Sequence, residues 1–416
     1  MSAIGLLLGL LVLSYVGTIL VGGRTIRGFG LPSGAEYVLL GFVLGPRLLG
    51  VISGTLVVAF APILVVGCAW LALVAGTSYC QVGERKVRPS RALAGILLAS
   101  LIAAGVAAAV YFGLGFAPQL KESQRSLLAG GAAAVSCETT RHAVRWVVER
   151  HGAHGQLSDT LADYARASVL VPALILAVLF AAAPDQGLST LTIPARAGLT
   201  IFVGVVLGLV ATVLLGRDFR RDESWGILLG SSLLGMGIAT RLGQSAVATT
   251  FFMGLTVALV SPHRSEIKTM VAPTEKPVVL PVAVLAGASV HPEAAPFALL
   301  LIAAGVAARL ISELLRGSLV ALFLRAARPA GPLVGVGMVS TGAFSLAAAV
   351  AIELRLPGEL GASVLAYAAA SLLMGELLGP LLLRRALSLA GDIAPGDARL
   401  PAPPSTRAPP HQPESP

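Results

Sequence analysis

Ser136-Cys137-Glu138-Thr139-Thr140 is a run of polar residues inside an otherwise apolar stretch of the chain. A weaker polar run, Ser340-Thr341-Gly342 before Phe344-Ser345, lies far downstream. A carboxylate in the hydrocarbon core of a membrane is costly unless it faces a partner or water, so Glu138 is a candidate functional residue. Interrupted helices at corresponding places in two chain halves are typical of secondary transporters.

The composition indicates the class of protein. Of the 416 residues, 56% are hydrophobic and 12% are charged, and the mean hydropathy is +0.84. These values predict an all-α polytopic membrane protein held in a lipid bilayer. The net charge of +9 comes from basic residues in short loops, where such residues set membrane topology. No loop is long enough to build a basic face, so we expect no nucleic-acid partner.

The sequence lacks the signals of a soluble enzyme. It has no glycine-rich phosphate loop, no Cys/His metal cluster and no nucleophile elbow between a strand and a helix. Cys68, Cys80 and Cys137 are scattered and give neither a disulfide framework nor metal-ligand spacing. We therefore expect no catalysis, no cofactor and no resident metal.

Apolar segments of about 20 residues predict the membrane spans. Thirteen candidates lie near 3–21, 36–53, 55–79, 92–116, 127–149, 160–183, 194–215, 224–241, 244–262, 277–291, 295–324, 331–352 and 361–386. Basic residues gather in alternate loops, from Arg24 and Arg27 to Arg384 and Arg385. The positive-inside rule makes those loops cytoplasmic. The pattern predicts a multi-pass protein of the plasma (inner) membrane, with its N-terminus outside and its C-terminus in the cytoplasm.

The two ends of the chain differ in character. The stretch from Met1 to Leu20 is apolar and lacks a preceding basic region, which indicates a retained first span and not a cleaved signal peptide. We expect residues 1–390 to form the transmembrane domain. From Gly391 the chain is polar and rich in proline, which predicts a disordered cytoplasmic tail over 391–416.

Two pairs of predicted spans share motifs at the same offset. The spans at 36–53 and 244–262 both contain a glycine-bearing apolar motif, and those at 127–149 and 331–352 both contain a polar break. Each pair is seven spans apart in our assignment. An odd offset makes the paired helices run in opposite directions, as inverted repeats require.

The chain resembles the cation:proton antiporter superfamily, in its bacterial Kef- and NapA-like branch of sodium/hydrogen exchangers. The segments that carry the resemblance include Tyr37 to Pro46, Ala248 to Leu255, His263 to Ile267, Leu280-Pro281 with Gly287, and Ser340 to Ser345. It covers essentially all of residues 1–388. The resemblance implies an NhaA/NapA-like fold of about thirteen helices, with interleaved dimerisation and core subdomains and two discontinuous helices that cross. It also implies a homodimer that exchanges a monovalent cation for a proton.

The chain departs from this family at the acidic pair that follows the first broken helix. The best correspondence places Val171-Pro172 there, and a register keyed on Pro172 places Arg166-Ala167 there; neither contains an acid. Asp159 and Asp163 lie earlier, where we expect surface or capping roles. Without that carboxylate, the competition between proton and cation needs another group.

Three charges within the predicted spans could replace the missing acid: Glu138, Arg309 and Glu376. For Glu138 the alternatives are ion or proton binding, or a local pair with Arg141 or His142. Arg309 matches the family's basic residue in the eleventh span and could face Glu138 or Glu313, its neighbour at i+4. The candidate ion- and proton-binding residues are Ser136, Glu138, Thr139, Arg309, Glu313, Ser340 and Thr341.

The sequence leaves three functions open. The first is a Na⁺ or K⁺:proton antiporter with no metal beyond the transported cation. The second is an uncoupled or organic-anion transporter, since a lone arginine keeps its charge and attracts anions. The third is a membrane scaffold or sensor that kept the fold without transport.

Overall fold

The structure is a computed structural model that describes residues 34–79, 89–183, 191–216, 221–291, 295–356 and 358–393. The predicted span at 3–21, Cys80 and the tail beyond residue 393 lie outside these residues, as do the basic residues Arg24 and Arg27. Every regular element in the described part of the chain is helical.

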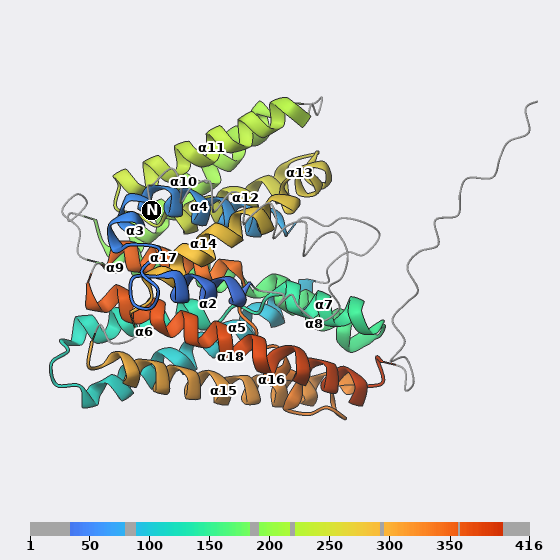
Figure 1. The fold of residues 1–416 in the computed structure, drawn as a ribbon. Helices are drawn as coiled ribbons and strands as arrows, with labels where there is room; N and C mark the ends of the chain where they lie inside the picture. The colour runs from blue at the N-terminus through green and yellow to red at the C-terminus, as the bar shows by residue number, and fades with distance from the viewer. Residues whose placement is uncertain are drawn as a thin grey trace, which may run out of the picture.

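The helices pack in two groups, one mostly in the upper half and the other mostly in the lower half of Figure 1, which overlap in the middle of the view. The first helix group contains α2 (Ala35–Leu44), α3 (Gly54–Ala59), α4 (Ala61–Thr77), α10 (Ile193–Leu214), α11 (Arg221–Arg241), α12 (Ala246–Val260), α13 (Arg264–Val271), the 3₁₀ turn η2 (Ala272–Thr274) and α14 (Glu275–Ser289). Its centre is α12, which packs against α4, α10 and α11, while α14 packs against α2 and α4.

The second helix group contains the polar breaks. Its members are α5 (Pro89–Gly113), η1 (Leu114–Phe116), α6 (Glu122–Ser136), α7 (Arg141–His151), α8 (Gln156–Ser168), α9 (Leu170–Ala182), α15 (Ala298–Phe323), η3 (Arg325–Ala327), α16 (Leu333–Gly337), α17 (Ala343–Arg355) and α18 (Glu359–Leu389). The two groups meet chiefly where α17 packs on α4 and where α9 packs on α10.

Six helical segments of the described residues are long and apolar enough to span a membrane. They are Pro89–Phe116, Gln156–Ala182, Ile193–Leu214, Arg264–Ser289, Ala298–Phe323 and Glu359–Leu389, and shorter apolar helices cover Ala35–Leu44, Ala61–Thr77 and Ala246–Val260. The total of thirteen spans stays a prediction.

Glycine permits the closest helix contacts of the first group. A Cβ atom on Gly41 of α2 would collide with the backbone carbonyl of Val284 in α14, and one on Gly287 of α14 would collide with the carbonyl of Val38. Without a hydrophobic drive between helices in lipid, small residues let two backbones approach and gain van der Waals contact. The glycine motif in the predicted span at 36–53 therefore also serves helix packing.

Replacing Gly41 by alanine should destabilise the protein by about 1–3 kcal/mol, because the added methyl group pushes α2 off α14. Gly226 of α11 is the matched control, since a Cβ there meets no atom within 4 Å. Gly226→Ala should be neutral or stabilising by about 0.5–1 kcal/mol, the helix-propensity difference. Thermal unfolding of both variants in the same detergent measures the contrast; equal melting temperatures would argue against the tight α2–α14 contact.

Helical interruptions lie at both polar breaks that the sequence indicates. Residues 137–140 separate α6 from α7, and residues 338–342 separate α16 from α17. A third, shorter break at Val169 separates α8 from α9. Pro172 contributes to it, because proline lacks the N–H that would bond the carbonyl of Ser168.

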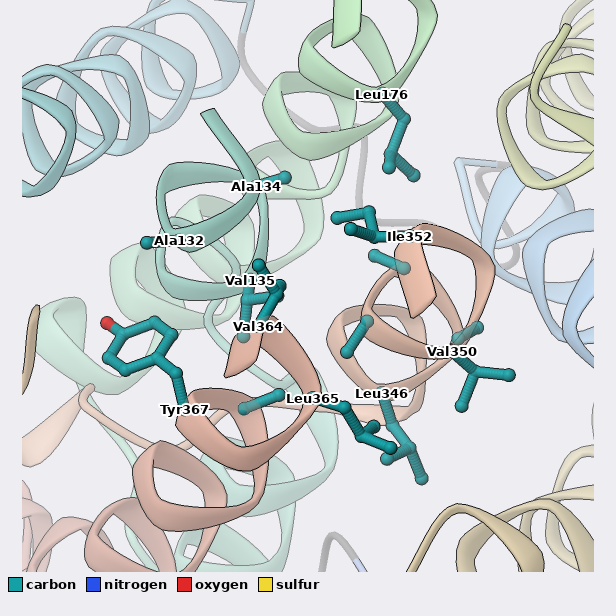
Figure 2. Packing of buried hydrophobic residues seen from close by; sticks show 14 of the residues in the cluster. Ala132, Ala134, Val135, Leu176, Leu346, Val350, Ile352, Val364, Leu365 and Tyr367 are labelled. Carbon is teal, nitrogen blue, oxygen red and sulfur yellow. The ribbon is translucent and has the colours of Figure 1, made fainter. Parts of the chain in front are cut away.

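Apolar packing between α6, α9, α17 and α18 fixes the helices on either side of the interruptions. Figure 2 shows Val135 of α6 beside Val364 of α18, with α17 packed close by. The side chains that form this part of the core include Ala132, Ala134, Val135, Leu176, Leu346, Val350, Ile352, Val364, Leu365 and Tyr367. The polar residues of the interruptions are thus surrounded by packed apolar side chains.

Candidate functional site

The two interruptions contact each other in the interior of the second helix group. The backbone N–H of Thr140 donates to the carbonyl of Ser340 over 2.9 Å. Residues 137–140 and 338–342 are all buried. Non-helical backbone at membrane depth is tolerated only where protein or a water-filled cavity satisfies it, and here each interruption helps to satisfy the other.

Glu138 caps the N-terminus of α17. Its Oε2 atom accepts hydrogen bonds from the backbone N–H and from the hydroxyl of Ser345, both over 2.6 Å. Ser345 is the third residue of α17, where backbone N–H groups have no partner within the helix. A carboxylate is favoured there because the helix dipole makes this end positive. Gly342 provides the space for this carboxylate, since a Cβ at that position would lie 2.5 Å from Oε1 of Glu138.

Of the two alternatives for Glu138, the local pair with Arg141 or His142 is wrong. Arg141 places Nη2 at 2.7 Å from Oε2 of Glu275, and His142 places Nε2 at 2.9 Å from Oε1 of the same residue. Helix α7 starts at Arg141, so both side chains leave the helix in its first turn. Glu275 begins α14 of the first helix group. Arg141 and His142 pair with this residue instead of with Glu138.

Arg309 makes neither of the ion pairs that the sequence suggests. Its guanidinium donates to the hydroxyl of Ser371 and to the backbone carbonyl of Val339. Val339 lies just beyond the C-terminus of α16, the negative end of that helix. Arg309 therefore neutralises one helix end as Glu138 neutralises another, and the described residues show no ion pair between them.

Glu313 pairs with Arg316 instead, which the sequence reasoning missed. Oε2 of Glu313 lies 2.5 Å from Nη2 of Arg316, and both side chains are almost fully buried. Arg316 also donates to the hydroxyl of Thr139 over 2.8 Å and to the carbonyl of Gly335 over 3.3 Å. The available signal was the i,i+3 spacing, which places both residues on one helix face.

The remaining candidates lie in the same buried region. Ser136 donates to the carbonyl of Ala132 over 2.6 Å and shares a 2.5 Å hydrogen bond with the hydroxyl of Tyr367. Ser340 donates to the carbonyl of Gly375 over 3.0 Å, and Thr341 is buried beside it. The structure thus brings all seven sequence-predicted residues to one region around the interruptions.

Hydroxyl groups face the site where an acid was expected. Val171 and Pro172 are buried and apolar, and the hydroxyl of Ser168 accepts the backbone N–H of Thr139 over 3.1 Å. The expected surface role of Asp163 is wrong, because Asp163 is buried and pairs with Arg91 of α5 over 3.3 Å. In the described residues, Glu138 is therefore the carboxylate at the contact between the interruptions.

Tyr79 bridges the break between α8 and α9. Its hydroxyl donates to the carbonyl of Ala167 over 2.9 Å and accepts the N–H of Leu170 over 3.2 Å. The ring of Tyr79 packs edge-on against Phe251, which packs in the same way against Phe344 of α17. These aromatic rings connect α12 of the first helix group to α17 of the second.

Tyr79→Phe should destabilise the fold by about 1–3 kcal/mol, because the backbone N–H of Leu170 loses the acceptor that the Tyr79 hydroxyl provides and the carbonyl of Ala167 loses one of its donors. Tyr111 also bonds through its hydroxyl, to Glu122 over 3.2 Å, but on an exposed face. Tyr111→Phe is therefore the control and should not change the melting temperature. Equal thermal stability of the two variants would show that water replaces the Tyr79 hydroxyl at the break.

Comparisons with known proteins supply an independent observation. No protein-family model and no curated protein matches the chain. Among solved structures, the sodium proton antiporter MjNhaP1 from Methanocaldococcus jannaschii matches with a TM-score of 0.63 at 17% identity, over 94% of this chain and 98% of that chain. The chain has the fold of a sodium/proton antiporter. It is therefore a multi-pass membrane protein with a transporter fold.

Proposed function

We propose that the chain is a secondary active transporter that exchanges a monovalent cation, Na⁺ or K⁺, for protons. The single observation that supports this most is the buried Glu138 at the contact between two helical interruptions, in a chain with an antiporter fold. An intramembrane carboxylate at such a place is a functional-site hypothesis by default. No cofactor is part of the proposal.

Glu138 is the proposed exchangeable group. A carboxylate holds either a proton or a cation, so one buried acid couples the two by competition. Hydroxyl groups of Thr139 and Ser340, together with backbone carbonyls that the interruptions free from helices, are the oxygen ligands that hard cations prefer. Ser345 would release Glu138 in part when either ion binds, which links ion binding to the start of α17.

The proposed motion slides the second helix group, as the core subdomain, against the first, as the dimerisation subdomain. The interruptions then act as the crossing helices of an inverted repeat, within thirteen spans. The basic loops orient the N-terminus outside and the C-terminus in the cytoplasm of the plasma membrane. A homodimer completes the proposal, with the exposed Gly230 and Gly237 of α11 available for close helix contact.

Proton flux in proteoliposomes tests the proposal. Purified protein is reconstituted with an internal pH-sensitive dye, and Na⁺ or K⁺ is added outside between pH 6 and pH 9. We expect cation-dependent alkalinisation or acidification that a protonophore collapses. Absence of flux with both cations across this range would contradict exchange.

A second candidate function rests on the buried arginines. Arg309 and Arg316 are almost fully buried near the interruptions, and Val171-Pro172 supplies no acid. Arg316 donates to Thr139, so a permanent side-chain cation occupies part of the space around that hydroxyl. This favours uncoupled or organic-anion transport, or a non-transporting scaffold. Thermal stabilisation by small anions and not by Na⁺ or K⁺ would support it over antiport.

A further inference from the structure

A three-residue cluster joins the two helix groups at the level where α7 begins. Glu275 of α14 accepts Arg141 through one carboxylate oxygen and His142 through the other, over 2.7 and 2.9 Å. The side chain of Glu275 is 13% exposed and that of Arg141 is 27% exposed. Two charge-assisted contacts to one largely buried carboxylate are strong in this setting.

The position of Glu275 is fixed from the first helix group. Thr274, the residue before it, accepts a 2.8 Å hydrogen bond from the indole N–H of Trp70 in α4. Its partners are fixed from the other side, because Arg141 directly follows the interruption at 137–140. The cluster therefore connects the rigid start of α14 to the segment that contains Glu138.

Three further ion pairs each lie within a single helix group. Arg91–Asp163 lies between α5 and α8, both in the second group, and Arg316–Glu313 and Arg145–Glu149 each lie within one helix. A displacement of one group against the other leaves these pairs intact. The same displacement must separate Glu275 from Arg141 and His142.

We propose that Glu275 is a latch carboxylate that holds the two helix groups in this arrangement, and that its release is an obligatory step of the transport cycle. The role in the transport cycle rests on the proposed function, whereas the latch itself rests on the geometry of Glu275 and its two partners. Separating the largely buried carboxylate of Glu275 from both of its partners leaves its charge uncompensated, which is unfavourable. Release therefore requires that a proton or a cation neutralise Glu275 as Arg141 and His142 withdraw.

This role makes Glu275 a positioning residue for Glu138. While the latch is closed, α7 cannot move away from α14, so the interruption at 137–140 keeps its position relative to the first helix group. When Glu275 is neutralised, the same interruption is free to move with the second group. The chain would in this way use Glu275, a second carboxylate on the first helix group, for ion dependence. The expected acidic pair cannot supply it, because Val171-Pro172 occupies that position.

Distance measurement between the helix groups tests the latch without any transport assay. Spin labels are placed at Arg150→Cys on α7 and Thr269→Cys on α13, two exposed positions, in full-length protein whose native cysteines are replaced by alanine. Pulsed electron resonance in lipid nanodiscs then gives the distribution of label distances. Glu275→Gln should raise the population at displaced distances by about tenfold or more, the effect of losing charge-assisted hydrogen bonds.

Three variants separate the latch from a general loss of structure. Glu149→Gln removes an equivalent charge from the exposed Arg145–Glu149 pair of α7 and should leave the distribution unchanged. Glu275→Asp and the charge swap Glu275→Arg with Arg141→Glu keep the attraction, so both should restore the narrow distribution. A distribution for Glu275→Gln identical to that of the parent would overturn the latch.

Flux measured on the same variants distinguishes the latch from the proposed function. A displaced distribution in Glu275→Gln, without cation-driven proton flux in the parent protein, leaves the latch standing and removes the antiport proposal. Cation-driven proton flux in the parent protein, with an unchanged distance distribution in Glu275→Gln, supports the antiport proposal and contradicts the latch. If Glu275→Gln does not fold, the charge swap decides: a narrow distribution supports the latch, and a broad one contradicts it.

Discussion

Glu138→Gln is expected to reduce cation-driven proton flux to the background of protein-free liposomes. Glutamine has nearly the shape of glutamate, and its amide oxygen can still accept from Ser345. It cannot exchange a proton for a cation, so the competition that couples the two ions is lost. Proteoliposome flux at matched protein content measures the effect, and thermal unfolding shows how much structure is retained.

Two companion variants separate ion exchange from helix capping. Glu138→Ala removes the cap as well and should cost about 1.5–3 kcal/mol of stability, the value of hydrogen bonds to a charged group. Ser345→Ala removes one hydroxyl donor and leaves the carboxylate in place, so flux should persist. Undiminished flux in Glu138→Gln would reduce Glu138 to a cap for α17.

Arg316→Met should destabilise the protein by about 3–5 kcal/mol, the largest stability loss that we expect from a single substitution in this chain. The substitution leaves the buried carboxylate of Glu313 without its ion-pair partner and removes the hydrogen-bond donor to Thr139. Methionine fills most of the volume, so the loss reflects charge and hydrogen bonding more than a cavity. Chemical or thermal unfolding in detergent gives the difference.

The double substitution Glu313→Leu with Arg316→Met is the control for this effect. Replacing both members of a buried pair by apolar residues is often neutral or stabilising by about 1–4 kcal/mol. We therefore expect the double variant to recover most of the stability that Arg316→Met loses. If both variants unfold alike, the contact of Arg316 with Thr139 outweighs its pairing with Glu313.

The positions of the helical interruptions were predictable from sequence for a physical reason. Serine, threonine and glutamate stand out in an apolar run, because each polar group in lipid needs a partner. The polar runs at 136–140 and 340–345 therefore also mark two places where the backbone leaves the helix. The apolar helices around them follow from hydropathy in the same way.

The partners of the charged groups were not predictable in this way. Spacing along a helix ranks only the neighbours at i+3 and i+4, whereas Glu138 finds its donors in Ser345 of another helix. Glu275 was hidden for a different reason. It stands next to Lys276 in a stretch that the sequence assigns to a cytoplasmic loop, yet it starts a helix and is largely buried. Only tertiary packing shows that Arg141 turns toward it.

The hydrogen bonds between Glu138 and Ser345 join residues that are 207 positions apart, and this separation bears on how the protein is made. At a synthesis rate of about 5–20 residues per second, α6 waits roughly 10–40 s before α17 leaves the ribosome. During that interval the nascent first half contains an acid whose partner does not yet exist. The second half of the chain thus supplies the partner of Glu138 only after the first half has been made, and a product truncated before α17 lacks that partner.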